Sequence, residues 1–511
     1  MSALSDAIAR SFSVREPDSA PSPLSALGRR RLSGAEVFAQ SVATTAPAAS
    51  MVIVPVTLIA HGMLLSGLVV IVLATILISS VALCVSQFTR RMIAAGGLYS
   101  FVAQGLGRRS ALTSALAMLA KYLASASMTL YHGGYAVVTL LGAVGIDASG
   151  TLARVCIYGT IAIALLSLLV RGVKVAAIAI LVVEACSLVF IVVLMVFAGS
   201  SGQPPQVSPA DTPSMLAIVL VVIFSLAGFE SATFVGPEAR RPYTSVTRTV
   251  LWTPVVCGAL FVFAAWATWS GRSGTVVNAY LHGTSTGVDG AVVVTLQAAL
   301  TFSWLASATA SANAASRLLY TLGLERTLPH AFSRVHLAFR TPATALAAFV
   351  TVIAAAAITT TVVGRTVVFA QLQPVTRAAV IASYVLVAVA SVAFVRRIRE
   401  QTPAVMGACG AGTTAGVGVV AAMLWTNLQT HTWNVPVVIV GLGMSGCVWY
   451  LVLRRRAPRS LLRIGVFDRP GSDDVLPGAG RYDTDAVGDL VLSAEPGTAG
   501  GSGTTGGRGG P

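Results

Sequence analysis

The stretch FSLAGFESATFVGPEARRPY, residues 224–243, decides how the fold is interpreted. It closes an apolar run, and Gly228 and Glu230 stand where that run is interrupted. Glycine weakens a helix locally, and a carboxylate inside an apolar segment is costly unless it is paired or neutralised. The stretch therefore predicts a broken helix whose acid has a partner, a cavity or water beside it.

The whole chain has the composition of an integral membrane protein. Hydrophobic residues make up 55% of its 511 residues and charged residues only 10%, and the mean hydropathy is +0.80. Water does not solvate such a chain, whereas a bilayer does. Apolar runs of about 20 residues, each long enough to cross the hydrocarbon as a helix, predict an all-α fold with about twelve transmembrane helices. They lie near residues 37–62, 63–85, 110–142, 151–170, 175–199, 214–236, 247–270, 291–315, 342–364, 375–395, 404–427 and 433–453.

The loops between these runs differ in positive charge. If the helices alternate in direction, the loops of one side hold little beyond Arg154, Arg272 and Arg365. By the positive-inside rule, we expect an even number of helices with both termini in the cytoplasm. The loops of that cytoplasmic side carry Arg29–Arg31, Arg90, Arg91, Arg108, Arg109, Arg171, Lys174, Arg240, Arg241, Arg248, Arg317, Arg326, Arg334, Arg340, Arg396, Arg397, Arg399 and Arg454–Arg456.

Three parts of the chain are expected from these patterns. Residues 1–35 are expected to form a disordered cytoplasmic tail. This tail is polar and has no cleavable signal peptide, so the first helix is expected to remain as an anchor. Residues 36–456 form the transmembrane domain. Residues 457–511 form a Gly-rich tail that we expect to be disordered.

Several function classes are disfavoured. The net charge of +15 comes from arginines that flank membrane spans, and the compact basic domain with interleaved aromatics of a nucleic-acid binder is missing. The six cysteines lie singly in apolar runs without a CxxC pair, which predicts small buried hydrophobes and neither a metal site nor a disulfide framework. We therefore expect the lipid bilayer and a small molecule as partners, no nucleic acid and no cofactor.

Three ionisable residues fall inside the predicted helices and not at their ends. They are Lys121 in the third helix, Glu184 in the fifth and Glu230 in the sixth. Such residues are candidates for a functional site because each needs a partner, a cavity or water. A purely structural alternative remains, in which Glu184 pairs with Lys121 and fastens two helices together.

The first helix contains a second interruption, in SVATTAPAASM at residues 41–51. Pro47 removes an amide donor there, and small residues around it give a ligand access to the main chain. Two broken helices, one opening each half of a chain, indicate a binding site near the bilayer midplane. Amides at one half-helix N-terminus suit a carboxylate and carbonyls at a C-terminal end suit an ammonium group, so a zwitterion is the expected ligand.

With these features, the chain resembles members of the amino acid/polyamine/organocation (APC) superfamily. The resemblance runs from about residue 36 to residue 456 and implies a five-plus-five inverted repeat with broken helices one and six. It rests on four motifs in order: AAGGLYSFVAQGLGRR (94–109), GFESATFVGPEARRP (228–242), SANAASRLLYTLGLERTLPHAFSRVH (311–336) and RTP (340–342).

The resemblance also implies roles for single residues. Phe224 corresponds to an aromatic gate, and Ala227, Gly228 and Phe229 to an unwound link whose carbonyls take an ammonium. Glu230 resembles a structural or proton-sensitive hinge acid. Glu184 lies near a position where some sodium-independent relatives carry a lysine, so the acid there binds a proton, helps to hold a cation or pairs with Lys121.

The first helix departs from the family pattern. Many relatives have a Gly-Ser-Gly-like stretch whose amides hold the substrate carboxylate, whereas this chain has Ala46-Pro47-Ala48. A carboxylate is then left with the amides of Ala48 and Ala49 or the hydroxyls of Thr44 and Thr45. The substrate is therefore either an α-amino acid or another small amine.

Coupling to protons is favoured over coupling to sodium. The eighth helix offers oxygens for a sodium site at Ser303, Ser307, Thr309 and Ser311, but hydroxyls at such spacing more often pack against neighbouring helices. Glu184 and Glu230, as carboxylates expected to be buried, favour protons, and Lys121 is the third candidate for a coupling residue.

We therefore expect a secondary transporter of the plasma membrane, a permease for an amino acid or related amine that works by alternating access. Two alternatives remain: a nutrient sensor that binds without transporting, and an intramembrane enzyme that uses Glu184 and Glu230 as a carboxylate pair. No nucleophile, base or metal-ligand pattern supports the enzyme.

Overall fold

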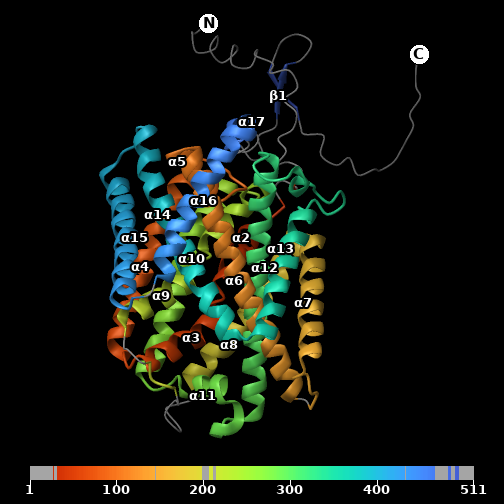
Figure 1. Cartoon of the computed structure of the whole chain (residues 1–511), viewed down its shortest axis with the longest axis vertical. Helices are drawn as coiled ribbons and strands as arrows, with labels where there is room; N and C mark the ends of the chain where they lie inside the picture. The colour runs from red at the N-terminus through yellow and green to blue at the C-terminus, as the bar shows by residue number, and fades with distance from the viewer. Residues whose placement is uncertain are drawn as a thin grey trace, which may run out of the picture. The chain divides into compact units, whose positions relative to one another are not determined.

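The computed structural model describes residues 27, 31–143, 145–197, 207–210, 214–431, 433–466, 481–484 and 490–493. The chain divides into two units, Met1–Arg469 and Pro470–Pro511. The first unit is a helical bundle (Figure 1). Its elements are α2 Gly34–Thr45, α3 Pro47–Ala60, α4 Leu64–Thr89, α5 Leu98–Leu106, α6 Arg108–Ala143, α7 Thr151–Arg171, α8 Val173–Phe197, α9 Met215–Leu226, η2 Phe229–Glu238, α10 Pro242–Trp269, α11 Gly274–His282, η3 Gly283–Thr286, α12 Gly290–Leu324, η4 His330–Ser333, α13 Ala343–Val363, α14 Arg365–Arg397, α15 Pro403–Gln429, α16 Asn434–Arg456 and α17 Pro458–Arg463.

Each of the twelve predicted apolar runs corresponds, within the described residues, to a helix or a broken helix. Within the described ranges, eleven spans are long and apolar enough to cross a membrane. The remaining predicted run corresponds to α6, a 36-residue helix that is less apolar because Lys121 and several serine, threonine and tyrosine side chains lie along it. The chain is therefore a multi-span membrane protein, as its composition predicts.

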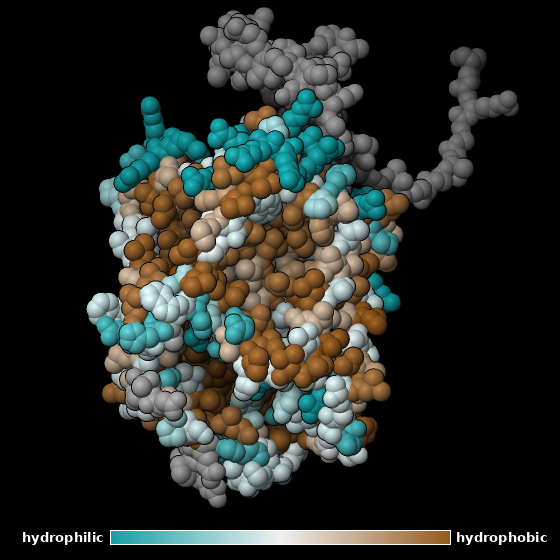
Figure 2. Space-filling model, in the orientation of Figure 1, coloured by the Kyte–Doolittle hydropathy of each residue, from teal (hydrophilic) through white to brown (hydrophobic). Residues whose placement is uncertain are grey.

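The surface of the bundle agrees with a place in lipid. Figure 2 shows apolar side chains spread over the middle of the bundle and hydrophilic side chains gathered at the end where α5 and α17 lie in Figure 1. The helices differ in how deeply they are buried: the most apolar window of Gly34–Ala60 is 78% buried, and that of α16 only 11%. The first helix is thus central and α16 peripheral.

The first membrane helix is broken at Ala46, between α2 and α3. Ser33 caps α2 with a capping box completed by Glu36, and the helix ends at Ala46, whose backbone is left-handed at φ 44° and ψ 58°. Pro47 then occupies the first position of α3, where its missing amide costs nothing. The break predicted from the proline is confirmed.

The sixth helix is broken at Gly228, between α9 and the 3₁₀ helix η2. Ala227 is extended and Gly228 has a φ of 145°, which side-chain-bearing residues rarely adopt. A Cβ atom at residue 228 would lie 2.7 Å from Cγ2 of Thr44. Glycine is therefore required here both by the backbone angle and by the close approach of the first helix.

One end of the bundle is closed by contacts between distant segments. Arg317 of α12 forms a buried ion pair with Glu238 at the end of η2. The amides of Arg31 and Leu32 donate to the Glu238 carbonyl at 2.8 and 2.9 Å, and the amide of Arg240 donates to Leu32. The segment before α2 therefore lies beside the end of the sixth helix at this closed end.

The second unit contains a two-stranded antiparallel sheet, β1 Arg481–Thr484 and β2 Leu490–Ser493, with Arg481 opposite Ser493. The tail that we expected to be disordered thus has local structure at these eight positions. Residues 457–466 of the same predicted tail are also described and contain α17, whereas residues 467–480, 485–489 and 494–511, most of the N-terminal tail, and Arg29 and Arg30 lie outside the described residues.

Candidate functional site

The two helix breaks touch each other. Besides the close approach of Thr44 to Gly228, the Ser41 hydroxyl donates to the Phe229 carbonyl at 2.7 Å. The Thr44 hydroxyl lies 2.8 Å from the Gln40 carbonyl and 2.9 Å from the Ser231 hydroxyl, and donates its one proton to either of them. The residues predicted at the first and sixth breaks are therefore brought together, as a substrate site between them requires.

Glu184 of α8 lies at the start of α3. Its Oε1 accepts hydrogen bonds from the amide of Ala48 at 3.0 Å and from the hydroxyl of Ser303 at 2.9 Å. The amide of Ala49 donates to the Ser303 oxygen at 3.3 Å. The Glu184 side chain is 3% exposed, and its Oε2 has no hydrogen-bond partner in the described part of the chain.

Glu230 lies at a different place, in the first turn of η2 directly after the sixth-helix break. It forms an ion pair with Lys121 of α6, and both side chains are buried. The hydroxyls of Tyr122 and Tyr384 each donate to its carboxylate at 2.9 Å, and the amide of Gly228 donates at 3.1 Å. The alternative in which Lys121 pairs with Glu184 is therefore wrong, because the lysine is bound to Glu230.

The remaining predicted residues line the contact between the breaks. The Thr45 hydroxyl donates to the Val42 carbonyl at 2.6 Å and contacts the Cys257 sulfur at 3.3 Å. Phe229 is fully buried with its ring 5.4 Å from that of Tyr384. The Ala227 carbonyl accepts no hydrogen bond from any residue that the structure describes. It is thus a free acceptor at the sixth-helix break.

Arg377 was missed by the sequence analysis. We expected the tenth helix to begin at residue 375, but α14 begins at Arg365 and continues through Pro374, so Arg377 lies well inside the helix. Its guanidinium lies over the ring of Phe224, 5.9 Å from the centroid. The signal that could have found it was a charged residue just inside the predicted start of an apolar run.

The hydroxyls considered for sodium already have partners, with one exception. Ser303 donates to Glu184, Ser307 to the Thr44 carbonyl at 3.0 Å, and Thr309 to the Leu305 carbonyl at 2.6 Å. The Ser311 hydroxyl is buried without a partner among the described residues. No group of three or more His, Cys, Asp or Glu side chains suited to a metal ion is found in those same ranges.

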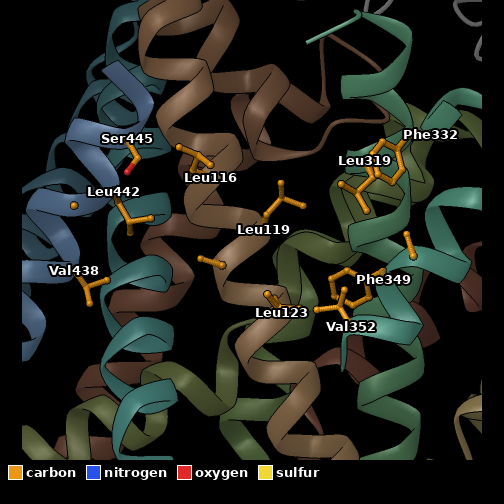
Figure 3. Close-up of a pocket in the computed structure, with 13 residues that line it drawn as sticks. Leu116, Leu119, Leu123, Leu319, Phe332, Phe349, Val352, Val438, Leu442 and Ser445 are labelled. Atoms are coloured by element: carbon orange, nitrogen blue, oxygen red, sulfur yellow. The ribbon is translucent and has the colours of Figure 1, made fainter. Parts of the chain in front are cut away.

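An apolar groove of about 580 Å³ lies elsewhere, between α6, α12, α13 and α16 (Figure 3). Leu119 and Leu123 of α6, Phe349 of α13 and Leu442 of α16 point into it (Figure 3). The only polar side chain in its lining is Ser445. The groove therefore offers no charged partner to a polar ligand, and the helix breaks remain the candidate site.

A model of the family described as amino acid permease matches residues 35–445. The matched range includes both helix breaks, Glu184, and the ion pair of Lys121 with Glu230. No curated protein matches the chain.

Proposed function

Because the chain belongs to the amino acid permease family, within the APC superfamily, we propose that it is a secondary transporter of the plasma membrane that carries an amino acid or related amine. The family indicates a transporter of a small molecule and not an enzyme. The distribution of arginines supports a cytoplasmic position for both termini. The observation that carries the proposal is the contact between the two breaks, since broken helices that meet form the binding sites of such transporters.

The substrate lies between residues 44–49 of the first helix and residues 224–229 of the sixth. Phe224, next to Arg377, forms the outer wall of this site. The free Ala227 carbonyl provides an acceptor for an ammonium group. Gly228 permits the two breaks to approach, and alternating access occurs by rocking one set of helices against the other around them.

The coupling ion is a proton, and Glu184 carries it. Glu184 is buried, one of its oxygens has no partner, and no lysine or arginine pairs with it in the described residues. Proton binding to the free oxygen removes the charge while Oε1 keeps its two hydrogen bonds. The Cys257 thiol of α10, which contacts the Thr45 hydroxyl at 3.3 Å, is a titratable group close to this end of the first helix.

Glu230 and Lys121 serve the same transporter as a fixed junction of three helices. Four donors already bind the Glu230 carboxylate, two at each oxygen. No lone pair of the carboxylate is left free to accept a proton. We therefore assign the coupling role to Glu184 and the bracing role to the pair of Glu230 with Lys121. Glu184 and Glu230 take separate partners, which disfavours the carboxylate pair of an enzyme.

Uptake into proteoliposomes tests this proposal. Radiolabelled amino acids and amines are offered under an imposed pH gradient or sodium gradient to the wild type, Glu184→Gln and Ser187→Ala. Ser187 lies one turn along the same helix, where its hydroxyl donates to the Val183 and Ala299 carbonyls at 2.9 and 3.2 Å, and it is the matched control.

We expect uptake that follows the pH gradient in the wild type and in Ser187→Ala, and that ignores the gradient in Glu184→Gln. Sodium-driven uptake that survives in Glu184→Gln would contradict proton coupling. Substrate-induced thermal stabilisation without flux would favour the nutrient sensor.

A further inference from the structure

We propose that the substrate is a cationic amine without a carboxylate beside its ammonium group, because the protein's own Glu184 fills the place that a substrate carboxylate would take. The proposal rests on the proposed transport function and specifies its substrate class. It arises from the juxtaposition of Glu184 with the first turn of α3.

The amides at the start of α3 are all accounted for. Pro47 has no amide hydrogen. Ala48 donates to Glu184, Ala49 donates to Ser303, and the Ser50 amide donates to the Ala46 carbonyl at 3.0 Å. A helix N-terminus attracts an anion through its unpaired amides, and here the first turn has none left to offer.

The hydroxyls that could replace those amides are also used. The Thr44 hydroxyl donates to the Gln40 carbonyl or to Ser231, and the Thr45 hydroxyl donates to the Val42 carbonyl. A substrate carboxylate at this break would therefore have to displace Glu184. When Glu184 is ionised, the two carboxylates would also repel each other.

Acceptors, by contrast, remain available at the two breaks. Oε2 of Glu184 is buried and has no hydrogen-bond partner among the described residues. The Ala227 carbonyl likewise accepts no hydrogen bond from a described residue. An ammonium group carries three donors and no acceptor. The breaks thus suit a positive group, and a zwitterion would leave its carboxylate unsatisfied.

Glu184 occupies the start of α3 whether its carboxyl group is charged or neutral. Oε1 accepts the bonds from Ala48 and Ser303 whether or not Oε2 carries a proton. The start of α3 therefore stays filled at each stage of a proton-coupled cycle. The guanidinium of Arg377, over the Phe224 ring, is the other group that could bind a substrate carboxylate. The experiment below distinguishes binding at Arg377 from binding at the start of α3.

The test compares amino acids with the amines formed by removing their carboxyl groups. Lysine and cadaverine, ornithine and putrescine, histidine and histamine, and phenylalanine and phenethylamine form the panel. Binding is measured as thermal stabilisation of the purified full-length protein, and transport as counterflow in proteoliposomes without a gradient. The variants are Glu184→Ala, Glu184→Gln, Arg377→Gln and the control Ser187→Ala.

We expect at least one amine to bind about 10-fold or more tightly than its parent amino acid, because a site without partners for a buried polar group rejects that group strongly. Glu184→Ala frees the Ala48 amide for a substrate carboxylate, so the preference for the amine over its parent amino acid should become smaller. Glu184→Gln keeps an oxygen in place and, with Ser187→Ala, should retain the preference against the carboxylate.

Amino acids that bind as tightly as their amines, or more tightly, would overturn the proposal whether or not flux occurs. Loss of that amino acid binding in Arg377→Gln would then place the carboxylate at Arg377. Amines that bind but do not move would overturn the transport function and leave the substrate class standing. If no member of the panel binds or moves, both are wrong.

Discussion

The buried pair of Lys121 and Glu230 allows a quantitative prediction about stability. Their side chains are 2% and 0% exposed, and removal of one partner from a buried ion pair costs about 3–5 kcal/mol because the other charge is left without compensation. The two partners differ in what remains after removal. We therefore expect the two single substitutions to have unequal effects.

In Lys121→Met, the Glu230 carboxylate keeps three donors, the hydroxyls of Tyr122 and Tyr384 and the Gly228 amide. The loss should lie near the lower limit, about 3 kcal/mol. In Glu230→Gln, the lysine ammonium loses its anionic partner and keeps, among the described residues, the neutral amide oxygen of the new glutamine and the tyrosine ring faces 4.8 and 5.4 Å away. That loss should approach about 5 kcal/mol, reduced by what the rings contribute.

The double variant Lys121→Met/Glu230→Gln separates a true pair from two independent side chains. It contains no buried charge, so it should be more stable than Glu230→Gln alone. The assay is reversible unfolding in mixed micelles of mild detergent and dodecyl sulfate, followed by circular dichroism. If the double variant loses as much unfolding free energy as the two single variants together, the pairing is refuted. If Lys121→Met is as destabilising as Glu230→Gln, or more so, the assignment of the remaining donors is refuted.

Three further substitutions test the breaks and the closed end of the bundle. Gly228→Ala introduces a Cβ against the first helix and should abolish transport and lower the yield of folded protein. Gly236→Ala should be tolerated, because a Cβ there would meet nothing nearer than 3.7 Å. Equal effects of the two variants in size-exclusion and uptake assays would contradict the steric argument. Ala46→Gly relieves a left-handed alanine and should raise the free energy of unfolding by about 1 kcal/mol, so a clear loss in the same micelle assay would contradict the strain. Arg317→Ala breaks the buried pair at the closed end and should raise the rate at which Cys257 reacts with a thiol reagent in a chain without the other five cysteines; an unchanged rate would mean that this pair does not hold the end closed.

The sequence predicted the helices and the two breaks because each rests on local chemistry. Pro47 and Gly228 interrupt apolar runs by their own backbone properties, and the structure breaks the helices beside them. Partners across the bundle could not be predicted in the same way. Lys121 and Glu230 are 109 residues apart, and nothing in their neighbouring residues distinguishes Glu230 from Glu184 as the acid that meets the lysine.

Helix boundaries limited the search for the site. The tenth helix was predicted to begin near residue 375, but α14 begins at Arg365 and passes through Pro374, as membrane helices can when neighbouring groups satisfy the freed backbone. Arg377 therefore counted as a boundary residue. The role of Glu184 at the start of α3 also depended on packing, since α8 meets α2 and α3 only in the folded bundle.

The pairing of Lys121 with Glu230 also bears on how the chain enters the bilayer during synthesis. α6 is the helix missing from the eleven most apolar spans, and a lysine at a helix centre opposes insertion by about 2.5–3.5 kcal/mol. When the ribosome has just released this helix, Glu230 has not yet been made, and Tyr384 follows 154 residues later still. The third helix therefore carries Lys121 without its anionic partner until the sixth helix has been made, and without the Tyr384 ring until the tenth has been made. Premature termination before the sixth helix would leave a lysine in the membrane without its counterion.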